Sequence, residues 1–579
     1  MMIKKLFTQL KPPYLLADWA ITPAWFLIPL MFVAALMNGY LMIKNPNIGG
    51  DALQYHSVFH NFIAGKGWTN YDGVWLPVEA GYGLLSYLFF LVIKDIEYSG
   101  MLVSSVSYLA MIPTTYLAVK YLFGKRSALL ASFLIAFWPT LLSYSYINLT
   151  DSVFTFLLLL GFLLYSRVLL GNRSVLGEIF LGFVLGLAYL TREPEGFFVS
   201  ILVLLSLFLL SLWYWIRYRR GAETVYSWHT FFLTLRVGAF GFLIILFANS
   251  IFIYTQTGIW SISIKTMGDQ KALSVTVPLT DVTEFFEANH QSILDEDVNT
   301  SNANNVDLFA MVRQYMPLIV NPLTTVDELA FALARVNAHA FVPLALLWGV
   351  FPFLSKNSLN ISLYFVPRKL KKLLAFAIFA SPIILHAMLP NRYDNRYVMA
   401  YSVFVIIGAS VLSVKFLDTM FGSWGRDNSD IGLLLLCFLA LIASLFFGSP
   451  TLPQVLTEPH DHRGLRAAGI WLSDHVQEPQ NLNIITTKKG AVILFYASGK
   501  TFEMGRSLSG TSLTLEEISS LIKSREYDYL VLEPQYIAAS GKLLSLWDNP
   551  ELAQGYGLFL LYKDSSGLFQ VYAGSSITP

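Results

Sequence analysis

The chain has few charged residues and almost no cysteine. Of its 579 residues only 13% are charged, and the single cysteine, Cys437, lies in an apolar run. One cysteine excludes disulfides within the chain and a cysteine-based metal site. The net charge of +1 argues against a nucleic-acid partner, which would need a basic face. With 55% hydrophobic residues the chain is instead typical of a polytopic α-helical membrane protein.

Long apolar stretches recur from near the start of the chain to residue 448. Stretches of this kind predict α-helices that cross a bilayer. We expect about eleven spans, at residues 24–43, 101–121, 128–147, 152–170, 177–191, 197–215, 237–256, 336–354, 373–389, 398–414 and 431–448. The apolar segment 81–93 has only 13 residues, too few to span, and is expected to be an interfacial or re-entrant helix on the outer side.

Lysine and arginine collect in alternate loops, and basic short loops stay in the cytoplasm. Such residues precede the first span, follow the second and the sixth, and precede the ninth, as in the run 368–372. This predicts a cytoplasmic N-terminus. The loop 44–100, the loop 257–335 and the tail from 449 would then face outward.

The tail differs in pattern from the rest of the chain. After residue 448 the long apolar runs give way to short alternating elements. Helices are expected near 463–476, 489–497 and 513–524, and strands at 483–487, 529–533, 558–562 and 568–572. The expected organisation is a transmembrane catalytic domain, 1–448, followed by a small extracytoplasmic α/β domain, 449–579.

A carboxylate follows the first span closely. Asp51 lies in the segment Asn47 to His56, just beyond a 20-residue uncharged stretch. A carboxylate at the membrane edge stays hydrated and charged, and it can still reach a substrate whose tail lies in lipid. The structural alternative is that Asp51 caps a juxtamembrane helix.

A second acid, Asp151, opens the fourth apolar stretch after Asn148 and Thr150. It could bind a divalent cation or position a substrate hydroxyl. The alternative is a helix-start residue favoured by the helix dipole.

Several basic residues break the cytoplasmic preference for positive charge. Arg192, Arg392 and Arg396 lie at span ends on the predicted outer side, and Lys265 lies in the long outer loop. Arginine presents a planar fork of donors that matches phosphate oxygens, so the group is interpreted as a phosphate clamp. The alternatives are contact with lipid headgroups and pairing with Glu193, Glu195 and Asp394.

Two histidines, His56 and His60, lie one helical turn apart after Asp51. The spacing could hold a metal ion, but no third ligand lies nearby in the sequence, so a surface pair is the alternative.

A glycine loop that could cradle a nucleotide phosphate is also absent from the sequence, which disfavours a nucleotide-sugar donor.

Taken in order, these motifs resemble the GT-C superfamily of glycosyltransferases that use polyprenyl-phosphate sugars, in particular the branch of protein O-mannosyltransferases and lipid A aminoarabinose transferases. The resemblance covers about residues 24–414. The motifs are Gly50-Asp51 with Tyr55, Gly65-Lys66-Gly67-Trp68, the turn 122–126, Asp151, the turn 190–196 and Arg396-Tyr397.

The resemblance implies roles for individual residues. Asp51 would be the catalytic carboxylate, Asp151 would help to form the site, and Arg192 and Arg396 would contact the donor phosphate. The one cofactor left open is a divalent metal ion at Asp151. Asp51 is followed by Ala52 where mannosyltransferases have Asp-Glu, and the Trp-Trp-Asp motif of oligosaccharyltransferases is absent. Neither protein O-mannosylation nor N-glycosylation is therefore assigned.

The expected reaction moves one sugar from a polyprenyl phosphate to a lipid, glycan or protein acceptor on the extracytoplasmic face, with inversion. Asp51 would act as general base. Tyr55, Glu193 and Tyr397 would line the substrate site. The alternatives are a transporter or flippase of a lipid-linked or anionic solute, which should place charges mid-bilayer or carry internal repeats, and a structural subunit without catalysis.

Overall fold

The computed structural model describes most of the chain. The described residues are 24–46, 48–76, 78–171, 174–219, 225–257, 260–263, 337, 340, 367–381, 395–421, 426–447, 450–457, 463–487, 489–511, 513–537 and 541–574. They form two compact units. The first comprises residues 1–35, 107–142 and 150–452, and the second comprises 36–106, 143–149 and 453–579.

The described part of the first unit consists mainly of helices. They are α7 (Lys125–Ala136), α9 (Thr150–Leu169), α10 (Val175–Thr191), α11 (Glu193–Arg219), α12 (Val225–Thr257), α19 (Pro367–Ala380), α21 (Asn395–Phe421) and α22 (Arg426–Phe446). Three further helices, α3 (Ala24–Lys44), α6 (Ile96–Phe123) and α8 (Pro139–Tyr144), contribute residues to both units.

Six helices of the described residues are long and apolar enough to cross a membrane, namely stretches of α3, α6, α9, α11, α12 and α21. Three more apolar helices, α10, α22 and α5 (Ala80–Ile93), are shorter. The chain is therefore a multi-pass membrane protein. The count of eleven stays a prediction, because the expected span 336–354 and the second half of 373–389 lie outside the described residues, apart from residues 337, 340 and 381.

The expected span 128–147 is not one continuous helix. Helix α7 ends at Ala136 and α8 begins at Pro139. Proline has no N–H to donate and disfavours the helical conformation of the residue before it, here Trp138. The apolar pattern predicted this segment correctly as helix, but the break at Pro139 divides it.

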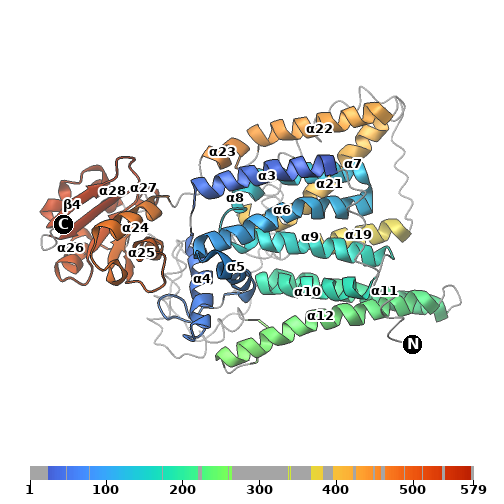
Figure 1. Ribbon diagram of the computed structural model, residues 1–579, viewed down its shortest axis with the longest axis horizontal. Helices are drawn as coiled ribbons and strands as arrows, with labels where there is room; N and C mark the ends of the chain where they lie inside the picture. The colour runs from blue at the N-terminus through green and yellow to red at the C-terminus, as the bar shows by residue number, and fades with distance from the viewer. Residues whose placement is uncertain are drawn as a thin grey trace, which may run out of the picture. The chain divides into compact units, whose positions relative to one another are not determined.

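Glycines allow the closest helix packing in the first unit. Helices α10, α11 and α12 pack against one another and run side by side in Figure 1. A Cβ on Gly182 of α10 would lie 2.3 Å from the carbonyl oxygen of Gly238 in α12, and one on Gly241 would lie 2.7 Å from that of Ile179. Small residues at such positions let two helix backbones approach, which is the usual source of helix association in lipid.

The second unit contains a five-stranded sheet in the order β2-β1-β3-β5-β4. Strands β2, β1 and β3 are parallel, and β5 pairs antiparallel with both β3 and β4. The strands are β1 (Ile484–Thr486), β2 (Ser507–Ser509), β3 (Tyr529–Leu532), β4 (Leu558–Lys563) and β5 (Gln570–Gly574), coloured orange to red in Figure 1.

Helices cover both faces of this sheet. Alternate strand residues fall into two separate hydrophobic clusters, Ile484 in one and Ile485 in the other, as the period of two in a strand requires. The first cluster includes α24 (Arg463–His475) and α25 (Gly490–Ala497), and the second includes α26 (Leu515–Lys523) and α28 (Gly541–Asp548). Four short elements complete the fold, α23 (Leu452–Thr457), η2 (Pro479–Asn481), α27 (Pro534–Ile537) and α29 (Leu552–Gly555).

The first predicted outer loop is part of the same core. Helix α4 (Gly50–Ile63) packs against α5 and against α25. Ile48, Ala52 and Leu53 are fully buried in the cluster that also holds α24 and α25. The domain boundary at residues 448 and 449 stays a prediction, but residues far before it contribute to the core that the C-terminal helices form.

Candidate functional site

Asp51 lies in the first turn of α4 and is exposed. The N-cap of the helix is Gly49, in an extended conformation (φ −76°, ψ 166°), which has no side chain to cap it. Asp51 is therefore not the N-cap that the structural alternative envisaged. The free N–H groups of a first turn favour an acidic side chain at this position.

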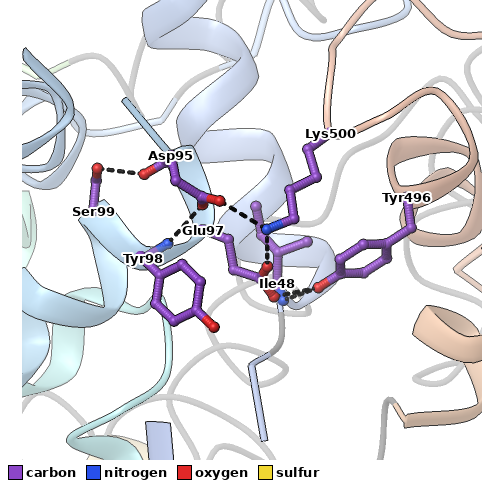
Figure 2. A network of polar contacts seen from close by, with 7 residues as sticks. All are labelled: Ile48, Asp95, Glu97, Tyr98, Ser99, Tyr496 and Lys500. Carbon is purple, nitrogen blue, oxygen red and sulfur yellow. Dashed lines mark hydrogen bonds and ion pairs between the residues drawn. The ribbon is translucent and has the colours of Figure 1, made fainter. Parts of the chain in front are cut away.

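A buried polar network fixes the segment that leads into α4 (Figure 2). The Ile48 backbone N–H donates to the Tyr496 hydroxyl at 3.0 Å, and this hydroxyl donates to Glu97 at 2.6 Å. The Lys500 ammonium pairs with Glu97 at 2.7 Å and with Asp95 at 2.8 Å. Together with the apolar contacts of Ala52 and Leu53, these bonds hold Asp51 on a rigid element.

The network depends on burial as well as on charge. Glu97 has no exposed surface, whereas the Lys500 side chain is 30% exposed. Burial and the negative charge of Glu97 raise the pKa of Tyr496 well above its usual value, so its hydroxyl stays a donor. Burial alone would lower the pKa of Lys500, but its bonds to Asp95 and Glu97 outweigh this effect and raise that pKa. Lysine therefore stays charged at neutral pH.

The two histidines of α4 are not a surface pair, because only His60 is exposed. His56 is buried, and its ring lies edge-on to the Tyr82 ring. The His60 ring packs against the Phe502 ring, with the two ring centroids 5.1 Å apart. Burial lowers the pKa of His56 to about 4, and the interaction with Asn148 offsets this only in part. A small pocket of about 30 Å³ lies between α4 and α5 and is lined by both histidines. Its volume is large enough for a water molecule.

Tyr55, expected to line the substrate site, lies on the same helix as Asp51. Its ring packs edge-to-face against Tyr82 of α5, with the ring centroids 6.0 Å apart. Tyr82 is fully buried and its hydroxyl donates to the Gly100 carbonyl at 3.0 Å. Tyr55 is thus held by the packing of α4 on α5 in the second unit.

Asp151 and Arg192 form a buried ion pair in the first unit. The Arg192 guanidinium donates to the Asp151 carboxylate, and its Nε lies 3.5 Å from the Thr150 hydroxyl. Its carbon lies 5.5 Å from the centroid of the Phe154 ring. Asp151 is 1% exposed and Arg192 is 6% exposed. The pairing alternative thus holds for Arg192, which pairs with Glu195 as that alternative envisaged and more closely with Asp151, which it did not name.

The local sequence explains why these two side chains meet. Asp151 lies in the first turn of α9, and Arg192 is the C-cap of α10, in an extended conformation. Pro194 lies in the first turn of α11, where a backbone N–H is not needed, so a new helix can begin at Glu193. Arg192 is thus the junction between α10 and α11. Since α9 and α10 pack against each other, the two helix ends bring the charges into contact.

The two glutamates after Arg192 differ in their partners. Glu195 lies 3.9 Å from the Arg192 guanidinium. Glu193 accepts from the Ser263 hydroxyl at 2.7 Å and from Asn249 at 3.4 Å. Asn249 also donates to the Tyr189 hydroxyl at 2.7 Å. Asn249 was not predicted to belong to the site, although an amide within the apolar stretch 237–256 is a signal of one, because a buried polar group needs a partner.

The structure therefore gathers Asp151, Arg192 and Glu195 in one cluster, with Glu193 beside it. Asp51 and Tyr55 belong to the other unit. Lys265 and Arg392 lie outside the described residues, and Arg396 and Tyr397 lie in the first turn of α21 without described side chains.

A divalent ion at Asp151 stays a prediction. Among the described residues, no group of three or more histidines, cysteines or acids gathers as metal ligands would. The carboxylate of Asp151 contacts a guanidinium, so an ion would share that carboxylate with Arg192.

Known families and structures resemble the chain in part. The family model described as dolichyl-phosphate-mannose-protein mannosyltransferase matches residues 81–233. This range contains Asp151 and Arg192 but begins after Asp51. A comparison with curated protein sequences finds no match.

Solved structures resemble the chain over most of its length. The crystal structure of ArnT from Cupriavidus metallidurans bound to undecaprenyl phosphate is 11% identical, covers 96% of this chain and 100% of its own, and has a TM-score of 0.52. The oligosaccharyltransferase of Archaeoglobus fulgidus in the apo form is 14% identical over 96% of this chain and 75% of its own, with a TM-score of 0.47. The family match and the ArnT fold confirm the resemblance that the motifs predicted, to GT-C glycosyltransferases of the polyprenyl-phosphate-dependent kind.

Proposed function

We propose that the protein is a membrane glycosyltransferase that takes a single sugar from a polyprenyl-phosphate donor. The observation that carries the proposal is the shared fold with ArnT, whose structure is described as bound to undecaprenyl phosphate. The family match over residues 81–233 supports it independently of the fold. Lipid-linked donors also suit a chain whose apolar helices keep it in the bilayer.

Asp51 acts as general base in the proposed reaction. The acceptor oxygen or nitrogen forms a bond to the anomeric carbon while the bond from that carbon to the phosphate oxygen breaks, with inversion. The phosphate leaves with the electron pair, and the acceptor proton passes to Asp51. An exposed carboxylate at the start of a rigid helix is accessible to an acceptor and is held in place by Ile48 and Tyr496.

Arg192 stabilises the charge that grows on the departing phosphate, with Arg392, Arg396 and Lys265 as further members of the clamp. Its ion pair with Asp151 suggests a specific role for the second acid, which is to orient the guanidinium fork. Tyr55, Glu193 and Tyr397 line the substrate site. The site faces the outside of the membrane, with the N-terminus in the cytoplasm and residues 449–579 outside.

The transporter alternative is less favoured by the charge positions. Asp151, Arg192, Glu193 and Glu195 all lie at helix ends, in the first turn of α9 or α11 or at the cap of α10. A transporter should instead place ionisable groups near mid-helix or on broken helices.

The test is incubation of the purified chain in nanodiscs with radiolabelled polyprenyl-phosphate sugars and a membrane extract. We expect label to move to an acceptor fraction, and Asp51→Asn to abolish transfer without loss of monodisperse protein. Normal turnover by Asp51→Asn would contradict the role of this carboxylate, and absence of transfer with every donor would contradict the enzyme class.

A further inference from the structure

The carboxyl end of β1 has the topology of a ligand site. The chain passes from β1 through α25 to β2 and returns through α26 to β3, on the other side of β1. Helices α25 and α26 cover opposite faces of the sheet, as their separate hydrophobic clusters show. In open sheets with parallel strands, ligands bind at the carboxyl ends where the strand order reverses in this way.

Two buried hydroxyl groups lie at this point without partners. Thr486 ends β1, Thr487 follows it, and each is 1% exposed. Neither Oγ1 has a hydrogen-bond partner among the residues that the structure describes. The Thr486 side chain reaches the start of α25 with its methyl group, because its Cγ2 would lie 2.7 Å from a Cβ on Gly490. Buried hydroxyls are normally bonded, so these two are available to a ligand.

The backbone at the start of α25 is shaped for close approach. Lys489 is in the left-handed region with φ 56°, and the helix begins at Gly490. A Cβ on Gly490 would lie 2.5 Å from the Ser507 Cβ, so glycine is required there. The first N–H groups of a helix point outward unpaired and attract anions.

The Lys489 side chain also reaches the N-terminus of α4, whose first turn carries Asp51. The Lys489 Cγ and Cδ atoms lie 3.9 Å from the Cβ position of Gly50, the residue before Asp51. The side chain of an exposed lysine thus passes the first turn of α4. The start of α25 therefore adjoins the Thr486 side chain, and the Lys489 side chain runs from it to the start of α4. Helix N–H groups, an ammonium and hydroxyls each favour a phosphate, against the negative charge of Asp51 in the first turn of α4.

We propose that this cluster, Thr486, Thr487, Lys489 and the N-terminus of α25, is a phosphate-binding site. The proposal deepens the proposed function, because a phosphate held here lies next to the helix that carries Asp51. Its source is either the acceptor, as a phosphorylated glycan, or the carrier lipid.

The experiment measures protection of Lys489 from acetylation in the full chain in nanodiscs, by peptide mass spectrometry. Inorganic phosphate is compared with chloride at equal ionic strength, and the exposed Lys563 serves as internal reference. We expect phosphate to slow acetylation of Lys489 at least about threefold relative to Lys563, as a charge-assisted contact would. Equal rates for both lysines would overturn the proposal.

Matched variants separate the hydroxyl groups from the fold. The double substitution Thr486→Val and Thr487→Val should abolish protection, whereas Thr486→Ser with Thr487→Ser should retain it. Protection that persists in the valine variant would show an adventitious ion only and overturn the site. If the valine variant does not fold, loss of protection in the serine variant overturns the proposal and its retention supports it.

Two further arms identify the source of the phosphate. Undecaprenyl phosphate in the nanodisc tests the carrier, and a water-soluble sugar phosphate tests the acceptor. Protection in either arm supports the site and names its ligand, and protection in neither overturns it. Binding needs no turnover, so failure of the sugar-transfer assay with intact protection would contradict the enzyme class alone.

Discussion

Replacing Lys500 with methionine tests whether the buried network holds the Asp51 helix. Lys500→Met removes the ammonium that pairs with Glu97 and Asp95 but keeps an apolar stem of similar length. Loss of one partner of a fully buried ion pair costs about 3–5 kcal/mol. Because Lys500 and Asp95 are each 30% exposed, water compensates part of this loss, and we expect about 2 kcal/mol.

The assay is native-state hydrogen exchange of the full chain in nanodiscs, followed by mass spectrometry of peptides. A loss of about 2 kcal/mol corresponds to exchange about 30-fold faster in the segments that the network stabilises. We expect faster exchange in α25 and in α4 together, because the network and the apolar cluster join them. Near neutral pH the effect should not vary with pH, since the raised pKa of Lys500 means that its contribution is lost only above its ordinary value of 10.5.

Lys66 provides a matched control. It also pairs with an acid, Glu503 at 3.4 Å, but the two side chains are 54% and 84% exposed. Exposed pairs contribute about 0–1 kcal/mol, so Lys66→Met should leave exchange nearly unchanged. Faster exchange in α25 with unchanged exchange in α4 would refute the claim that the network positions the Asp51 helix.

Three further changes test other parts of the structure. Burial lowers the pKa of His56 to about 4, so below pH 6.5 the unfolded chain binds more protons than the folded chain does. Helix α4 should therefore lose ~3 kcal/mol of stability between pH 6.5 and pH 4. Hydrogen exchange should show this loss in the parent protein and not in His56→Gln. Arg192→Met leaves the Asp151 carboxylate buried without this ion pair and should lower the free energy of unfolding by about 3–5 kcal/mol, as thermal unfolding would show. The double variant with Asp151→Asn should lose less. Arg126→Met, which breaks the more exposed pair with Asp418, is the control and should lose less as well. A Cβ at Gly182 would meet the Gly238 carbonyl, so Gly182→Val should separate α10 from α12 and lower the unfolding temperature, and an unchanged temperature would contradict the close approach.

Local patterns predicted much of the secondary structure. Apolar runs of spanning length indicated α3, α6, α9 and α11, and short alternating runs indicated α24, α25 and β3 close to their observed bounds. Strand β2 was missed because its three residues, Ser507–Ser509, are exposed or half-buried and carry no apolar alternation. The break at Pro139 was missed because the apolar composition continues through it.

Long-range contacts were less accessible to sequence reasoning. Arg192 and Asp151 were both singled out as candidates, but their direct pairing follows from how α9 packs on α10. Glu97 and Tyr496 lie 399 positions apart, and neither has a local signal of partnership. Single residues with unusual chemistry can be found from sequence, whereas the partner that satisfies each buried charge is set by the tertiary fold.

The joint core of α4 and the C-terminal helices has a consequence for biosynthesis. Ile48, Ala52 and Leu53 are made early, yet the α24 and α25 side chains that bury them emerge from the ribosome some four hundred residues later. The segment that carries Asp51 must wait through nearly all of translation before its apolar face is covered. Chains that stop before α24 should therefore expose this face and be targets for quality-control proteases, even when their membrane helices have inserted correctly.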